Sequence, residues 1–156
     1  MKKSLPAIVI VLAIIGVVFA VAGSAAVAQA AEPHPHIYNA YRMLRRAHYV
    51  LQRSCRNLSG ERANALSEID AALNELKLAI AVDHGTLPLM TESGGIGVKR
   101  GQVHPYIHDA LRQSLDAKAE LAAAAQDFGG HRTAAIQHVD AAIAQLQLAV
   151  KLPPCD

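Results

Sequence analysis

Apolar side chains recur at intervals of three and four residues along residues 66–80 and again along residues 136–150. This spacing places them on one face of an α-helix. Alanines spaced seven residues apart border both seams, and such small side chains let a neighbouring helix approach closely. The pattern therefore predicts two amphipathic helices with coiled-coil-like faces. The seam positions are Leu66, Ile69, Leu73, Leu76, Ile80, Ile136, Val139, Ile143, Leu146 and Val150, and the alanines are Ala65, Ala72, Ala79, Ala135, Ala142 and Ala149.

A weaker apolar periodicity predicts two further helices upstream of these, over residues 35–57 and 107–128. Pro35 and Pro105 stand where a first helical residue belongs, because proline there removes no hydrogen bond that the helix would make. The phrases NLSG and DFGG then interrupt the periodicity, and glycine suits the positive φ angles that close a helix. Each half of the chain is thus predicted to be a helical hairpin.

The two hairpins are similar in sequence at a constant offset of 70 residues: IDAAL in the first matches VDAAI in the second. We assign repeat one to 34–82, a loop rich in Gly, Pro and Ser to 83–103, and repeat two to 104–152. A single hairpin leaves its apolar stripe in water, whereas two hairpins bury each other's stripes. The predicted fold is all-α, a four-helix bundle of two tandem αα-hairpins.

Two arrangements of the hairpins are compatible with the length of the 83–103 linker. If the linker is tight, the open ends of both hairpins lie together. If it crosses the bundle, the open end of one hairpin meets the turn of the other. Cys55 and Cys155 can form a disulfide within one chain only in the crossed arrangement. An exported chain with an even number of cysteines most often carries such a bond.

The first 30 residues resemble a secretory signal peptide. Lys2 and Lys3 precede a long apolar run, and Ala28-Gln29-Ala30 is a small-x-small cleavage pattern. The alternative is an uncleaved inner-membrane anchor, since the run of about 18 residues is at the lower edge of spanning length. We therefore expect a mature domain over 31–156, in the periplasm or secreted, with membrane attachment only if the leader is retained.

Removal of the leader changes the charge balance of the protein. The full chain has 15 Lys plus Arg and 13 Asp plus Glu, and the leader contains Lys2 and Lys3 but no acid, so the mature chain has 13 of each. A neutral domain lacks the basic patch that nucleic-acid binding requires, and no nucleic-acid partner is expected.

Register within each predicted hairpin follows from its turn. His48 should lie level with Asp70 in the first hairpin, and Lys118 with Asp140 in the second. Both pairs join a base to an acid at equivalent places in the two repeats. One interpretation of His48–Asp70 is an acid–base dyad. The other is a structural ion pair between helices, which the lysine in the twin position favours.

The eight histidines are the chain's most distinctive candidates for chemistry. Imidazole is a common ligand of copper, zinc and nickel. The candidate metal ligands are His34, His36, His84, His104 and His108. The first three are predicted to stay together in either hairpin arrangement, and the other two join them only if the linker is tight. The competing interpretation is that these are ordinary exposed or helix-start residues.

Catalytic sequence motifs are not found: there is no GxSxG, HExxH, P-loop or paired ExxH. We therefore expect a non-enzymatic protein with no certain cofactor. Two functions stay open, a periplasmic module that binds a transition metal and a structural or protein-interaction module of the cell envelope. The second predicts an envelope partner or a homo-oligomer.

The phrases HPHIYNAYRMLRRA and DFGGHRTAAIQHVDAAIAQLQLA resemble an element of small exported bacterial proteins, in which HPHI, a helix, GGHR and a second helix with IDxAIxQLQxA follow one another. The first repeat departs from it with SGER in place of GGHR. The resemblance implies export and a helical hairpin. A looser similarity to small histidine-rich periplasmic metal-binding bundles implies metal binding, although their histidines are denser than here.

Overall fold

The computed structural model describes residues 34–55, 60–88 and 103–154. The chain divides into two units, Met1–Ala30 and Ala31–Asp156, and every described residue belongs to the second. The predicted signal peptide and Cys155 lie outside the described residues, as does most of the predicted linker.

The described residues form four α-helices and a short 3-10 helix, without a β-strand, so the all-α prediction is confirmed. No described helix has both the length and the apolar character needed to cross a membrane. The α-helices are α1 (Pro35–Gln52), α2 (Glu61–Val82), α3 (Pro105–Ala123) and α4 (His131–Ala149), and the 3-10 helix is η1 (Phe128–Gly130). Helices α1 and α3 begin at the two prolines that mark predicted helix starts.

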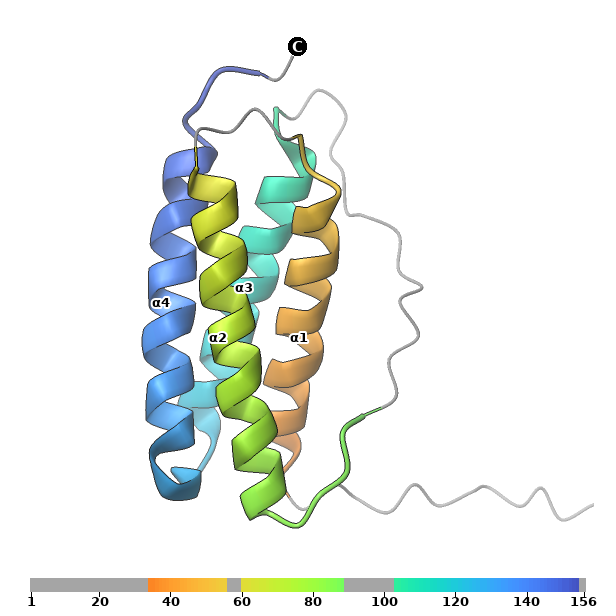
Figure 1. Cartoon of the computed structure of the whole chain (residues 1–156), viewed down its shortest axis with the longest axis vertical. Coiled ribbons are helices and arrows are strands. Elements are labelled where there is room, and N and C mark those ends of the chain that lie inside the picture. The colour runs from red at the N-terminus through yellow and green to blue at the C-terminus, as the bar shows by residue number, and fades with distance from the viewer. Residues whose placement is uncertain (1–33, 56–59, 89–102, 155–156) are drawn as a thin grey trace, which may run out of the picture. The chain divides into compact units, whose positions relative to one another are not determined.

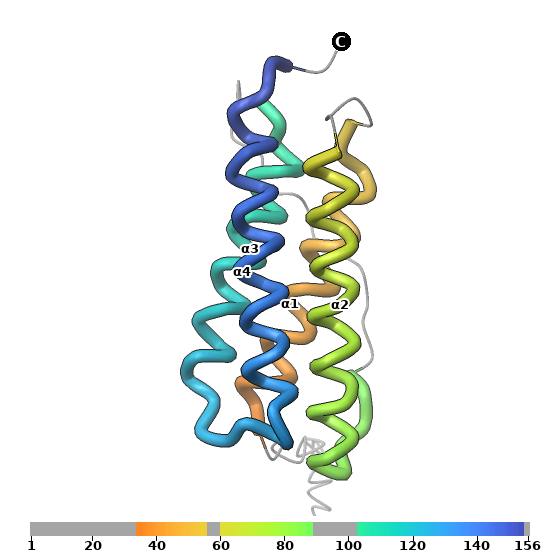
Figure 2. Tube along the Cα trace, turned by 60° about the vertical axis from the view of Figure 1, so that its left-hand side comes forward, coloured from red at the N-terminus to blue at the C-terminus, as the bar shows by residue number. Residues whose placement is uncertain are grey.

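The four helices lie side by side as a bundle, in which α1 packs against α2 and α3, and α4 packs against the same two helices. Helices α2 and α3 run in one direction, and α1 and α4 run in the other (Figures 1 and 2). The end of α2 and the start of α3 therefore lie at opposite ends of the bundle (Figure 1). Of the two arrangements that the sequence left open, the structure has the crossed one.

The predicted seams form the core where α2 faces α4. Ile69, Leu76, Val139 and Leu146 are fully buried, and so are all six alanines that border the seams. Burial of each large aliphatic side chain contributes about 1.5–3 kcal/mol, so this interface supplies much of the stability. Three predicted core residues lie at its edge and are only partly buried: Leu66, Ile136 and Val150.

Helices α1 and α3 end at Gln52 and Ala123, about one turn earlier than the periodicity predicts. The reason lies in Arg62 and Arg132, whose guanidinium groups bind carbonyl groups at the ends of these helices. Arg62 donates from Nε to the carbonyl oxygen of Leu51 at 3.0 Å. These bonds add donors to carbonyl groups in the last helical turn, where the helix leaves carbonyl groups without partners, and so stabilise the early helix end.

The turn between α3 and α4 requires unusual backbone angles. Phe128, Gly129 and Gly130 have φ values of +52°, +72° and +97°, a region that glycine adopts without strain. Asp127 then anchors the start of α4, because its Oδ1 accepts hydrogen bonds from the backbone nitrogen and the hydroxyl of Thr133 at 2.9 and 2.8 Å. The Thr133 hydroxyl bond lowers the pKa of Asp127, and the nearby guanidinium of Arg132 adds to this effect.

Candidate functional site

Histidine–carboxylate pairs recur between the helical segments that the structure describes. Within the described residues, five of the eight histidines make such a pair, and in each pair the two side chains come from different segments. Three of these pairs are hydrogen bonds, those of His36, His131 and His138, and the imidazole nitrogen is the donor in each because an ionised carboxylate only accepts. The pairs are His34–Asp83, His36–Glu120, His48–Asp70, His131–Glu75 and His138–Glu68.

His34 closes the open end of the first hairpin. Its Nε2 lies 3.1 Å from Oδ1 of Asp83, the residue that follows α2. The imidazole also meets the ring of Phe128 edge to face, with centroids 5.0 Å apart. Phe128 belongs to the turn of the second hairpin, so this contact joins the open end of one hairpin to the closed end of the other.

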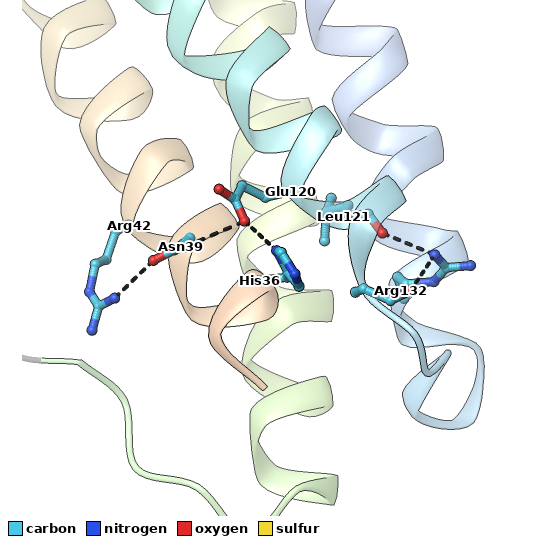
Figure 3. A network of polar contacts seen from close by, with 7 residues as sticks. His36, Asn39, Arg42, Glu120, Leu121 and Arg132 are labelled. Atoms are coloured by element: carbon cyan, nitrogen blue, oxygen red, sulfur yellow. Dashed lines mark hydrogen bonds and ion pairs between the residues drawn. The ribbon is translucent and has the colours of Figure 1, made fainter. Parts of the chain in front are cut away.

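A chain of polar contacts links α1 to α3 at the same end of the bundle (Figure 3). Glu120 on α3 accepts from Nδ1 of His36 at 2.7 Å and from the amide of Asn39 at 3.4 Å. The Asn39 oxygen in turn accepts from Arg42 at 3.2 Å. Glu120 thus ties the first turns of α1 to the last turn of α3.

Both predicted pairs within the hairpins are present. His48 Nε2 lies 3.2 Å from Oδ1 of Asp70, and Lys118 Nζ lies 2.6 Å from Oδ1 of Asp140. The exposed fractions of the two aspartate side chains are similar, 57% and 47%. An exposed carboxylate that meets a lysine in one hairpin and a histidine in the other fits a register contact better than an acid–base dyad.

Two histidines of α4 face two glutamates of α2. His131 and His138 donate from Nδ1 to Glu75 and Glu68, both at 2.8 Å. About a third of each side chain in these pairs is exposed. The sequence did not predict these two pairs, although it contains a signal for them: the two glutamates are seven residues apart, and so are the two histidines.

His104 is the most buried of the candidate ligands, with 7% of its surface exposed. It lies at the start of α3 with a φ of +52°, and its Nε2 donates to the carbonyl oxygen of Leu152 at 3.1 Å. Its Nδ1 is 3.9 Å from Sγ of Cys55. Cys55 therefore lies at the end of the bundle where the chain leaves α4, as a bond to Cys155 would require.

His84 occupies a strained turn after α2. Its φ is +54°, and its backbone nitrogen donates to the carbonyl oxygen of Ala81 at 3.1 Å. The next residue, Gly85, lies directly against the buried ring of Tyr38: a Cβ at Gly85 would be 1.6 Å from the tyrosine oxygen. His84 thus belongs to a turn that packs on α1.

The five candidate metal ligands lie in two places, as the sequence predicts for the crossed arrangement and not for the tight one. His34, His36 and His84 lie at one end of the bundle, and His104 and His108 lie at the start of α3, at the opposite end. The crossed connection is the cause. Among the described residues, no group of three or more His, Cys, Asp or Glu side chains is placed to hold a metal ion.

A buried carboxylate between α1 and α3 was not foreseen from the sequence. The side chain of Asp109 is 1% exposed, and its Oδ1 accepts from Nη2 of Arg112 at 2.5 Å. Arg46 reaches across from α1, with Nη2 at 3.7 Å from Oδ2. Arg46 and Arg112 are themselves partly exposed, at 30% and 55%. A buried carboxylate is costly without a cationic partner, and Arg46 is the partner through which Asp109 links α3 to α1.

The described arrangement is therefore a set of polar contacts that hold helices in register. The comparisons with known proteins add no relative: no protein-family model, curated protein or solved structure matches the chain. The resemblance to exported bacterial proteins stays a prediction.

Proposed function

We propose that the mature chain, residues 31–156, is a non-catalytic module of the bacterial cell envelope that acts through contact with another envelope protein or with a second copy of itself. In this proposal, the leader 1–30 directs export and is removed. The two hairpins are tandem repeats, and a Cys55–Cys155 disulfide closes the domain. The absence of a free cysteine among the described residues supports that bond.

The observation that carries the proposal is that most of the histidine side chains pair with carboxylates of neighbouring helical segments. Imidazole is the side chain best suited to proton transfer and metal ligation near neutral pH. Among the described residues, five of the eight imidazoles pair with a carboxylate of another helical segment. Side chains engaged in this way serve the fold. The surface also offers apolar contact positions, such as Leu78 and Val82 one turn apart on α2, at 48% and 53% exposed.

Site-specific photo-cross-linking in cells tests the interaction. A photoreactive residue at Leu78 or Val82 should give a discrete cross-linked species, either with an envelope protein or with a second copy of the chain. The control position is Gln137, an exposed polar residue of α4. If neither apolar position gives a species that the control lacks, the proposed interaction is wrong. Fractionation tests export separately: the mature protein should begin at Ala31 and be found outside the cytoplasm.

Transition-metal binding is the alternative, and it has its own measurement. Tag-free protein is titrated with copper, zinc and nickel, beside a variant in which His34, His36 and His84 are alanine. Saturable binding at micromolar metal that the triple variant loses would replace our proposal with a metal-binding function. We expect no difference between the two proteins.

A further inference from the structure

The interface between α2 and α4 carries two matched rows of polar side chains, one on each helix. Every member of a row is seven residues from the next, so each row follows one face of its helix. All six side chains are partly buried at the edge of the interface. The row on α2 is Glu61, Glu68 and Glu75, and the row on α4 is His131, His138 and Gln145.

Glu68 and His138 occupy the same position in the two halves of the chain, since they are 70 residues apart. They also contact each other at 2.8 Å. If both halves carried the same residue at this position, it would face its own duplicate: glutamate against glutamate, or histidine against histidine. The difference between the halves at this position is therefore what creates the contact.

The same relation extends along the interface. The numbers of both contacting pairs, Glu68–His138 and Glu75–His131, add up to 206. The next pair in this register is Glu61 and Gln145. One row holds only carboxylates, which accept hydrogen bonds, and the other holds imidazoles and an amide, which donate. Two α2 helices paired in this register would set carboxylates opposite carboxylates at all three levels.

We propose that these rows are a pairing code. They make α2 select a helix with hydrogen-bond donors at seven-residue spacing, which is α4, and reject a second copy of α2. The partner that the α2 surface fits is therefore the second hairpin and not another first hairpin. This inference concerns assembly of the bundle and stands independently of the proposed function.

An exchange of the central pair tests the code in the mature full-length domain. H138E places glutamate opposite Glu68, as in an α2–α2 contact, and E68H places two histidines opposite each other. The swap variant E68H/H138E restores an acceptor opposite a donor with unchanged composition. S67H and Q137E, at exposed neighbouring positions, are the matched controls for helix propensity and charge.

Urea unfolding at neutral pH gives the unfolding equilibrium constant of each variant. We expect H138E and E68H each to raise it about three- to tenfold, since a partly exposed charged hydrogen bond has about this effect. The swap variant should return to within about threefold of the parent, so that the two effects are clearly non-additive. If the unfolding equilibrium constant of the swap variant rises by the product of the two single-variant increases, the pairing code is wrong.

A gain-of-stability variant gives a second, independent measurement. Oε2 of Glu61 is buried and has no hydrogen-bond partner among the described residues. Q145H places a third imidazole at the same spacing as His131 and His138, opposite this glutamate. We expect the urea midpoint to rise above that of Q137H, a control on the exposed face of α4. An equal or lower midpoint contradicts the code at this level.

Discussion

Arg62 and Leu51 are joined across the first turn by a hydrogen bond of 3.0 Å, from Nε of the arginine to the carbonyl oxygen of the leucine. Seventy residues later, Arg132 donates from Nη1 to the carbonyl oxygen of Leu121, also at 3.0 Å. Both carbonyl groups lie in the last turn of a helix, where the helix itself leaves carbonyl groups without partners; the Leu51 carbonyl also accepts from the backbone nitrogen of Ser54 at 3.1 Å. One arginine thus closes each hairpin.

Replacing either arginine with alanine should lower the free energy of unfolding by about 1.5–3 kcal/mol, the usual range for hydrogen bonds that involve a charged group. Arg62→Lys should recover little of this, because Arg62 reaches two carbonyl groups from two different nitrogens, a planar fork that an ammonium group cannot reproduce. Arg132 reaches its two carbonyl groups from Nη1 alone, so Arg132→Lys should recover more. Urea unfolding followed by circular dichroism measures the effect. K77A, at an exposed position of α2, is the control and should change stability by less than about 0.5 kcal/mol.

Asp127 should make stability depend on pH in acid. Its pKa is lowered from 3.8 in the folded chain, chiefly by the Thr133 hydroxyl, so the unfolded chain binds this proton more readily. The stabilisation is complete above the unfolded-state pKa and is lost as the pH falls through the folded-state pKa. Unfolding free energies between about pH 5 and pH 2 should therefore fall less steeply for D127N than for the parent. Equal slopes would show that the ionised carboxylate contributes nothing.

Gly85 should not tolerate a larger residue while Tyr38 keeps its position. The Cβ of an alanine would lie 1.6 Å from the tyrosine oxygen and 2.9 Å from Cζ, and Tyr38 is 3% exposed, so it has little room to move. We expect G85A to cost about 1–3 kcal/mol, as overpacking usually does. Thermal unfolding measures this. Adding Tyr38→Phe removes the closest clashing atom and should make G85A less costly than it is alone.

His48→Lys tests whether the His48–Asp70 pair is structural. The change reproduces the Lys118–Asp140 pair of the second hairpin, and exposed ion pairs contribute little. We therefore expect the free energy of unfolding to change by less than about 0.5 kcal/mol. A loss above about 1 kcal/mol in urea unfolding would show that the imidazole itself is needed.

Register within each hairpin could be predicted from the sequence because the turn fixes it. The interruptions near Ser59 and Gly129 place His48 level with Asp70 and Lys118 level with Asp140, and both contacts exist. The predicted core alanines are buried for a related reason: their seven-residue spacing already defines the face that meets a partner helix.

Contacts between the hairpins could not be predicted because they depend on the direction of the crossing. His36 meets Glu120, and Arg46 meets Asp109, only when α1 and α3 are antiparallel. Residues this far apart in the chain share no local signal that would fix their level. The same uncertainty allowed His104 to be grouped with His34, although they lie at opposite ends of the bundle.

Two signals in the sequence were present but carried no assigned role. Arg62 and Arg132 match at the repeat offset, next to the residues that close the turns. Their function became clear only once the ends of α1 and α3 were known, because a side chain can satisfy a helix end only where the helix stops. The rows on α2 and α4 likewise acquire meaning only when the two helices are known to be antiparallel.

The crossed arrangement also determines where the helices of the bundle can fray. Each end has one turn closed by an arginine and one pair of helix termini that no short turn joins (Figure 1). Fraying begins where termini are least restrained. The exchange rates of backbone amides at the two ends should therefore be similar. In a side-by-side arrangement, the fast-exchanging amides would all lie at one end.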